Sequence, residues 1–122
     1  MLLIVDDDPA FLESARKVFG ADWKVFFAMN GKQALQLATD LEFSVVLVDL
    51  NLGKENGFGL IGEFHSLFPG LPVIAMSGVV KQQLLENAKA FGAVETLSKP
   101  ATADWKVLVG RLRSTQPANL AG

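Results

Sequence analysis

Short apolar runs alternate with amphipathic stretches along most of the chain. The continuous apolar run Leu2–Val5 is typical of a strand that is covered on both faces of a sheet. The same pattern predicts four further strands, over residues 23–28, 43–48, 72–76 and 94–98. Between the strands, apolar residues recur at intervals of three or four, which is typical of helices with one buried face.

Capping residues and glycines mark where the predicted helices begin and end. Asp8 followed by Pro9 is typical of a helix N-terminus, and Gly20 ends the apolar stripe of that helix. Asn30 and Gly31 open the second helix. The other three helices are predicted over residues 57–68, 80–91 and 103–113. The side chains predicted to point inward from the third helix are Leu60, Ile61, Phe64 and Leu67, and those from the last helix are Trp105, Leu108, Val109 and Leu112.

Five strands alternating with five helices predict a parallel sheet with right-handed crossovers and helices on both faces. We expect this α/β domain to occupy residues 1–113, and the small, polar residues 114–122 to form a tail or linker. In sheets of this kind, the ligand site lies beyond the carboxyl ends of the strands.

Polar side chains stand where four of the five strands end. Asp6 and Asp7 follow the first strand, and Asp49 follows the third. Ser77 follows the fourth strand and Lys99 follows the fifth. Because parallel strands end at the same edge of a sheet, we expect these side chains to gather there.

The residue types at this edge suit a divalent cation and a phosphoryl group. Carboxylate oxygens without histidine or cysteine favour Mg²⁺ or Mn²⁺ over zinc or iron. Asp6, Asp7, Asp49 and Lys99 together carry a charge of −2 when ionised, which one divalent cation would neutralise. An ammonium and a hydroxyl group can bind phosphoryl oxygens, and a carboxylate such as that of Asp49 can attack phosphorus.

Composition narrows the class of protein further. The chain has 122 residues, of which 50% are hydrophobic and 20% are charged, as expected of one globular domain. It has no cysteine and one histidine, which excludes disulfides, thiolate catalysis and histidine-rich metal sites. A net charge of −2 argues against an extensive nucleic-acid contact, and no apolar run reaches the roughly 20 residues of a membrane span. We therefore expect a cytoplasmic protein.

Four separated motifs, in order, carry a resemblance to a known family. They are "LLIVDDDP", "VVLVDLNLGKENGFGLI", "PVIAMSG" and "FGAVETLSKP". With these motifs, the chain from Met1 to about Arg113 resembles the receiver domain of two-component response regulators. The resemblance implies a flavodoxin-like, doubly wound (βα)5 sandwich, in which the five-stranded parallel sheet has the order 2-1-3-4-5.

The resemblance also implies a role for each acidic residue of the site. Asp49 would accept a phosphoryl group from the phosphohistidine of a histidine kinase. Asp6 and Asp7 would hold Mg²⁺ together with Asp49 and the backbone carbonyl of Asn51. Asp7 would bind the ion directly, and Asp6 would bind it through water.

Two further positions match the motifs of the family. Ser77 matches the hydroxyl residue that contacts the phosphoryl group, and Lys99 matches the lysine at the same site. The resemblance implies a cis peptide bond between Lys99 and Pro100.

Three positions depart from the family pattern, and none of them removes a catalytic group. Gly53 stands where proline is often found, which predicts a more mobile loop after the acceptor. Thr96 replaces the usual Tyr or Phe of the switch, and Ala101 replaces a common Phe, so the signal output is expected to differ.

The resemblance implies two kinds of partner: a sensor histidine kinase or phosphotransfer protein, and a downstream output domain or target protein. From the net charge and the lack of a long apolar run, we expect no direct contact of this domain with nucleic acid or membrane. A homodimer that forms on phosphorylation is left open. The chain would be a signalling phosphoprotein rather than an enzyme, although it assists its own phosphorylation and dephosphorylation.

Two other interpretations remain open from the sequence. Phosphatases of the haloacid dehalogenase type also place Asp-x-Asp after a first strand, then a Ser or Thr, and then a lysine. Asp6, Asp8, Ser77 and Lys99 fit that order, with Asp6 as the nucleophile. This interpretation leaves Asp49 without a role and lacks the acidic pair expected after the lysine. The other interpretation is a degenerate receiver that carries no phosphate and acts as a binding module.

Overall fold

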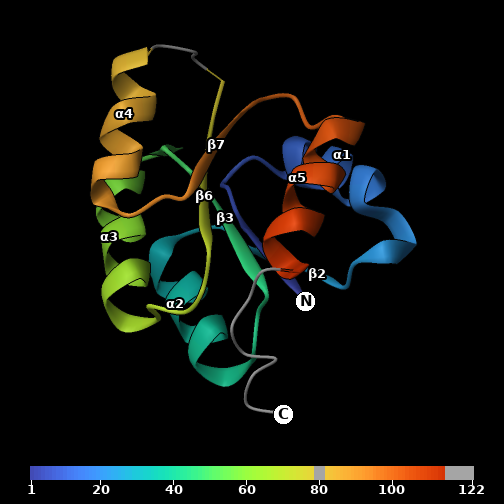
Figure 1. Ribbon diagram of the computed structural model, residues 1–122, viewed down its shortest axis with the longest axis horizontal. Helices are drawn as coiled ribbons and strands as arrows, with labels where there is room; N and C mark the ends of the chain where they lie inside the picture. The colour runs from blue at the N-terminus through green and yellow to red at the C-terminus, as the bar shows by residue number, and fades with distance from the viewer. Residues whose placement is uncertain (79–81, 115–122) are drawn as a thin grey trace.

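The computed structural model describes residues 1–78 and 82–114. Its main feature is a five-stranded parallel sheet in the order β2-β1-β3-β6-β7 (Figure 1). The strands are β1 (Leu2–Val5), β2 (Val25–Ala28), β3 (Val45–Asp49), β6 (Val73–Ser77) and β7 (Glu95–Ser98). Numbered among themselves along the chain, these strands have the order 2-1-3-4-5, which confirms the predicted flavodoxin-like α/β fold.

In the part of the chain that the structure describes, five α-helices cover the two faces of the sheet. They are α1 (Pro9–Phe19), α2 (Gly31–Asp40), α3 (Gly57–Leu67), α4 (Gln82–Phe91) and α5 (Ala103–Ser114). Helices α1 and α5 lie on one face, and α2, α3 and α4 lie on the other (Figure 1). Within the described ranges, every helix is too short or too polar to cross a membrane.

Each face of the sheet has its own apolar core, because successive strand residues point to opposite faces. From β1, Leu3 and Val5 pack toward α2, α3 and α4, whereas Leu2 and Ile4 pack toward α1 and α5. All four side chains are fully buried. At roughly 2 kcal/mol for each fully buried aliphatic side chain, such strands supply much of the driving force for folding.

Capping hydrogen bonds confirm the predicted starts of the first two helices. The Asp8 carboxylate accepts a hydrogen bond from the amide of Ala10 at 3.0 Å, and Pro9 occupies the first turn of α1. Asn30 caps α2 by accepting a hydrogen bond from the amide of Gln33 at 2.9 Å. Caps of this kind contribute about 1 kcal/mol each.

Several boundaries differ from the sequence-based expectations. Strand β2 begins two residues later than predicted, because Gly20–Asp22 form a short 3-10 helix (η1) that leads into it. Strand β3 also begins two residues later, and it includes Asp49 as its last residue. The predicted helix start at residue 80 and residues 115–122 of the predicted tail lie outside the described residues.

The prediction that Leu67 points inward is wrong. Its side chain is 61% exposed, because α3 ends at this residue and turns its last position away from the sheet. Phe68, the next residue, packs against the core instead, and its ring centroid lies 5.9 Å from that of Phe64. On α5, Trp105 and Val109 are buried as predicted.

A small hairpin follows Asp49 where the sequence predicts only a loop. Strands β4 (Asn51–Leu52) and β5 (Glu55–Asn56) pair in antiparallel orientation. Both oxygens of the Glu55 carboxylate accept a hydrogen bond from the amide of Gly31, each at 3.1 Å. This contact ties the hairpin to the N-terminus of α2.

Gly57, the first residue of α3, lies against the backbone that follows Asp49. Its amide donates a hydrogen bond to the Leu50 carbonyl at 3.3 Å. A Cβ at this position would press on the carbonyl oxygen of Asp49 and would lie 2.6 Å from the Cα of Leu50. The close approach therefore requires glycine.

We predict that Gly57→Ala destabilises the protein by about 2 to 3 kcal/mol, because rigid backbone has to move to admit the methyl group. Gly59→Ala is the matched control in the same helix, since a Cβ there would meet nothing within 4 Å. It is expected to stabilise the protein by about 0.5 to 1 kcal/mol. Urea denaturation of the two variants measures both effects, and equal midpoints would contradict the prediction.

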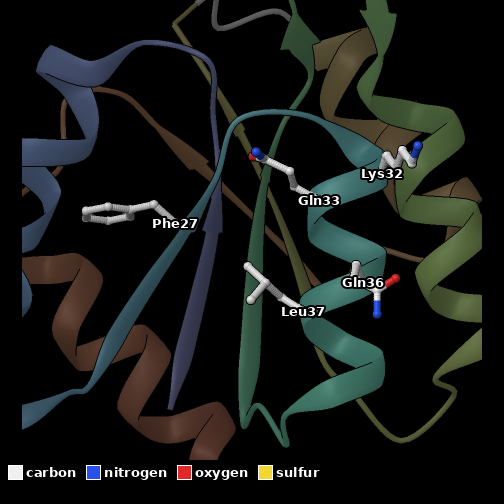
Figure 2. Close-up of a pocket in the computed structure, with 5 residues that line it drawn as sticks. All are labelled: Phe27, Lys32, Gln33, Gln36 and Leu37. Atoms are coloured by element: carbon white, nitrogen blue, oxygen red, sulfur yellow. The ribbon is translucent and has the colours of Figure 1, made fainter.

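A pocket of about 410 Å³ lies between the edge strand β2 and α2. It is lined by Phe27, Lys32, Gln33, Gln36 and Leu37 (Figure 2). Gln33 and Leu37 extend from α2 toward the strand, whereas the Phe27 ring turns away from the helix (Figure 2). None of the polar residues predicted to form the functional site lines this pocket.

Candidate functional site

The register of the sheet brings the predicted strand ends together. Val5 at the end of β1 pairs with Val48 of β3, so that Asp6 and Asp49 leave adjacent strands at the same edge. Ser77 pairs with Ser98 at the ends of β6 and β7, and the Ser77 carbonyl accepts a hydrogen bond from the Lys99 amide at 2.9 Å. The predicted gathering of polar residues at one edge is therefore present in the structure.

The Lys99 ammonium group bridges two carboxylates from different strands. Its Nζ lies 2.9 Å from Oδ2 of Asp49, to which it donates a hydrogen bond, and 2.5 Å from Oδ2 of Asp6. The peptide bond between Lys99 and Pro100 is cis, as predicted. Burial acts to lower the pKa of Lys99, but the adjacent Asp6 and Asp49 outweigh it and raise that pKa above its usual value. The side chain therefore remains an ammonium ion.

Asp6 is fully buried, and its two carboxylate oxygens differ in their surroundings. Oδ1 accepts a hydrogen bond from the amide of Asp8 at 2.9 Å. Oδ2 makes the ion contact with Lys99 but has no hydrogen bond within the described part of the chain. Burial raises the pKa of Asp6, and the charge of Asp49 adds to this effect, whereas Lys99 opposes it. The protein therefore offsets only part of the cost of burying the negative charge of Asp6.

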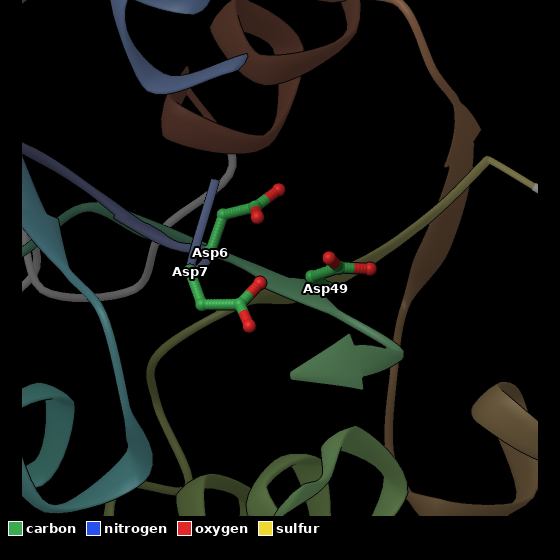
Figure 3. A group of neighbouring side chains, drawn as sticks. All are labelled: Asp6, Asp7 and Asp49. Atoms are coloured by element: carbon green, nitrogen blue, oxygen red, sulfur yellow. The ribbon is translucent and has the colours of Figure 1, made fainter. Parts of the chain in front are cut away.

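Three carboxylates form an acidic cluster at this edge. Asp6, Asp7 and Asp49 each place an oxygen within 4.8 Å of the others (Figure 3). Asp6 and Asp49 are buried and Asp7 is exposed. Oδ1 of Asp49 also accepts a hydrogen bond from the Asn51 amide at 3.1 Å, which holds the start of the β4–β5 hairpin against the cluster.

Gly53 at the tip of the hairpin has a φ of 59°, a conformation that favours glycine. A Cβ at this position would lie 2.8 Å from Oδ2 of Asp7. Glycine therefore allows the hairpin to approach the exposed carboxylate of the acidic cluster.

Sequence reasoning did not foresee two contacts that shape the site. The Glu55–Gly31 hydrogen bond joins positions 24 residues apart, and no local pattern signals it. The Phe11 ring, which belongs to the buried apolar face of α1, lies next to the Lys99 ammonium group. Both contacts arise when separate elements dock at the edge of the sheet.

A flavodoxin-like sheet with clustered carboxylates, a serine and a lysine at adjoining strand ends defines a class of domain suited to bind a cation and a phosphoryl group. The family model of the response regulator receiver domain matches residues 2–109, and the chain belongs to this family.

Similar proteins agree with this assignment. A response regulator receiver protein of Anaeromyxobacter sp. (strain Fw109-5) is 33% identical over 100 residues, which are 80% of this chain and 42% of that protein. The chain thus spans less than half the length of this relative. A CheY-like receiver domain protein from Methanospirillum hungatei JF-1 superposes with a TM-score of 0.87 at 25% identity, covering 97% of this chain and 96% of that one.

A third similar protein is a response regulator from Burkholderia pseudomallei. Its crystal structure contains a phosphorylated aspartic acid, a calcium ion and citrate. It has a TM-score of 0.80 and 25% identity, and the match covers 93% of this chain and 70% of that one. Together these findings give the chain the phosphoacceptor role of a receiver domain in two-component signalling, and they do not favour the dehalogenase-type or degenerate interpretations.

Proposed function

We propose that Asp49 is the residue that accepts the phosphoryl group, and that Lys99 and Ser77 bind the oxygens of that group. The observation that carries this proposal is the Lys99 ammonium group, which lies 2.9 Å from the Asp49 carboxylate at the carboxyl edge of the sheet. A buried carboxylate beside an ammonium group is suited to receive a phosphoryl group, because the ammonium group offsets the negative charge that the phosphoryl group brings.

In the transfer, an oxygen of Asp49 forms a bond to phosphorus while the phosphorus–nitrogen bond of the donor phosphohistidine breaks. The electron pair of that bond leaves with the histidine. Lys99 keeps its proton, since the neighbouring carboxylates raise its pKa, and its ammonium group can donate hydrogen bonds to a phosphoryl oxygen. Ser77, at the end of β6, supplies a hydroxyl donor on the same edge.

The donor set of the acidic cluster fits Mg²⁺. The oxygens of Asp6, Asp7 and Asp49 lie within 4.8 Å of one another, and Oδ2 of Asp6 is buried without a hydrogen bond in the described part of the chain. Hard carboxylate oxygens, completed by the Asn51 carbonyl, suit this ion. When bound, Mg²⁺ would supply positive charge to the oxygens of the transferring phosphoryl group. The calcium ion and phosphorylated aspartic acid of the Burkholderia protein support this assignment.

The partners follow from the family and belong to the same proposal. A sensor histidine kinase or a phosphotransfer protein would donate the phosphoryl group in the cytoplasm, and an output domain or target protein would respond to it.

Phosphorylation by a small donor tests the proposed function without a cognate kinase. The protein is incubated with phosphoramidate and Mg²⁺, and its intact mass is followed over time. We expect the mass to increase by one phosphoryl group, and hydroxylamine to remove that group, because an acyl phosphate is labile to this nucleophile. Absence of any mass increase in the folded protein at saturating donor would instead support the degenerate receiver.

A further inference from the structure

An aromatic ring lies beside the ammonium group on which the proposed function depends. The Nζ of Lys99 is 4.4 Å from the centroid of the Phe11 ring. Phe11 belongs to α1 and is 8% exposed. The Lys99 side chain is 19% exposed, so the contact is largely shielded from water. An ammonium group over a ring face at this distance is attracted by the ring quadrupole, and the attraction strengthens where water is excluded.

The Phe11 ring is itself held in place from the side of α5. Its centroid lies 5.9 Å from that of Trp105, with the two ring planes inclined at 53°. Trp105 is 3% exposed and belongs to the same apolar cluster. Ala101, just after the Lys99-Pro100 bond, is half-buried against this cluster and contributes only a methyl group there. The phenylalanine and the tryptophan therefore fill the space beside the ammonium group.

The carboxylates and the ring act differently on Lys99 during phosphoryl transfer. When Asp49 becomes an acyl phosphate, its carboxylate charge is lost and the oxygens around the ammonium group change. The Phe11 ring makes and breaks no bond in this step, and its packing against Trp105 does not involve the reacting groups. Because a lysine side chain is long and flexible, a partner that stays fixed restricts where its ammonium group can lie.

We propose that Phe11 is a positioning residue for phosphoryl transfer. This role rests on the proposed function. The ring face of Phe11 holds the Lys99 ammonium group where the oxygens of the phosphoryl group on Asp49 come to lie. A leucine at position 11 would fill much of the same volume and would bury apolar surface as well. It would lack the π face, and the proposal depends on that difference.

Fluorination of the ring distinguishes the effect of the π face from the effect of the volume that the ring fills. Phe11 is replaced by phenylalanine analogues with one, two and three ring fluorines, which weaken the quadrupole stepwise and change the shape little. Phosphorylation by phosphoramidate is measured with Mg²⁺ for each protein. We expect the rate at saturating donor to fall stepwise, by about fivefold at three fluorines, with the half-saturating donor concentration nearly unchanged. Phe11→Leu is expected to match or exceed that loss.

Phe64 provides the matched control, because it is fully buried on the opposite face of the sheet and contacts Phe68 rather than the site. The same analogues at position 64 should leave the rate unchanged. A second readout is spectroscopic: the ε-methylene protons of Lys99 should show a ring-current shift that disappears in Phe11→Leu.

The outcomes separate this inference from the proposed function. If the wild-type protein is phosphorylated but fluorination of the ring at position 11 leaves the rate unchanged, the positioning role is wrong and Asp49 remains the acceptor. If the wild-type protein is phosphorylated but its Lys99 ε-methylene protons show no ring-current shift, the positioning role is also wrong. A wild-type protein that takes up no phosphoryl group overturns both the proposed function and the role of Phe11.

Discussion

Replacing Asp49 with asparagine is expected to abolish phosphoryl incorporation and to leave the fold intact. The amide of asparagine is a poor nucleophile toward phosphorus, whereas its size matches that of the carboxylate. Its oxygen can still accept the hydrogen bond that the Asn51 amide donates to Oδ1 of Asp49. Intact-mass measurement with phosphoramidate and Mg²⁺ should show no product, and circular dichroism should show an unchanged spectrum.

A control substitution and a substitution of the alternative nucleophile, Asp6, make this prediction more specific. Asp104→Asn removes an exposed carboxylate in the first turn of α5 that is not part of the acidic cluster, and it should label like the wild type. Asp6→Asn should slow labelling but leave Asp49 as the modified residue. Labelling of Asp49→Asn combined with no labelling of Asp6→Asn would show that Asp6 is the nucleophile, as in the dehalogenase-type interpretation.

Chelation of divalent cations is expected to stop phosphorylation of the wild-type protein. Asp6, Asp7 and Asp49 outnumber the single positive charge of Lys99, so a donor that carries negative charge meets an already negative site. A bound Mg²⁺ removes this repulsion and supplies a positive charge to the phosphoryl oxygens. Assays with and without a chelator measure the effect, and full labelling under chelation would contradict the prediction.

Asp7→Asn should weaken Mg²⁺ binding by at least about tenfold, because a carboxylate in contact with a divalent cation contributes more than the roughly 1.4 kcal/mol of a tenfold change. Tryptophan fluorescence can follow the titration, since Trp105 packs on the Phe11 ring beside Lys99. A Trp23→Phe background isolates the signal of Trp105.

Asp8→Asn is the matched control for this measurement. It removes a neighbouring charge of the same sign, and asparagine caps a helix as well as aspartate does, so α1 should be unaffected. We expect its Mg²⁺ affinity to stay within about twofold of the wild type, because an exposed charge outside the coordination site is screened by solvent. Equal losses in Asp7→Asn and Asp8→Asn would mean that general charge, rather than coordination, governs binding.

Local patterns in the sequence determined the elements and their order. A fully buried strand such as Leu2–Val5 is signalled by a continuous apolar run, and the α1 start is signalled by Asp8 and Pro9. The polar residues that follow these runs, such as Asp49, could be placed at one edge because parallel strands end together. Leu67 was misplaced because helical periodicity does not tell where a helix leaves the core. The β4–β5 hairpin was missed because strands of two residues have no period to detect.

Only the tertiary structure decided which atoms of the site face one another. Lys99 meets Asp49 across 50 positions of sequence, and its choice of Asp6 as second partner depends on the register of β1, β3 and β7. The placement of the Phe11 ring beside that ammonium group depends on how α1 and α5 pack together. Such contacts join elements whose relative position is set by the packing of the whole core, and no short stretch of sequence contains that information.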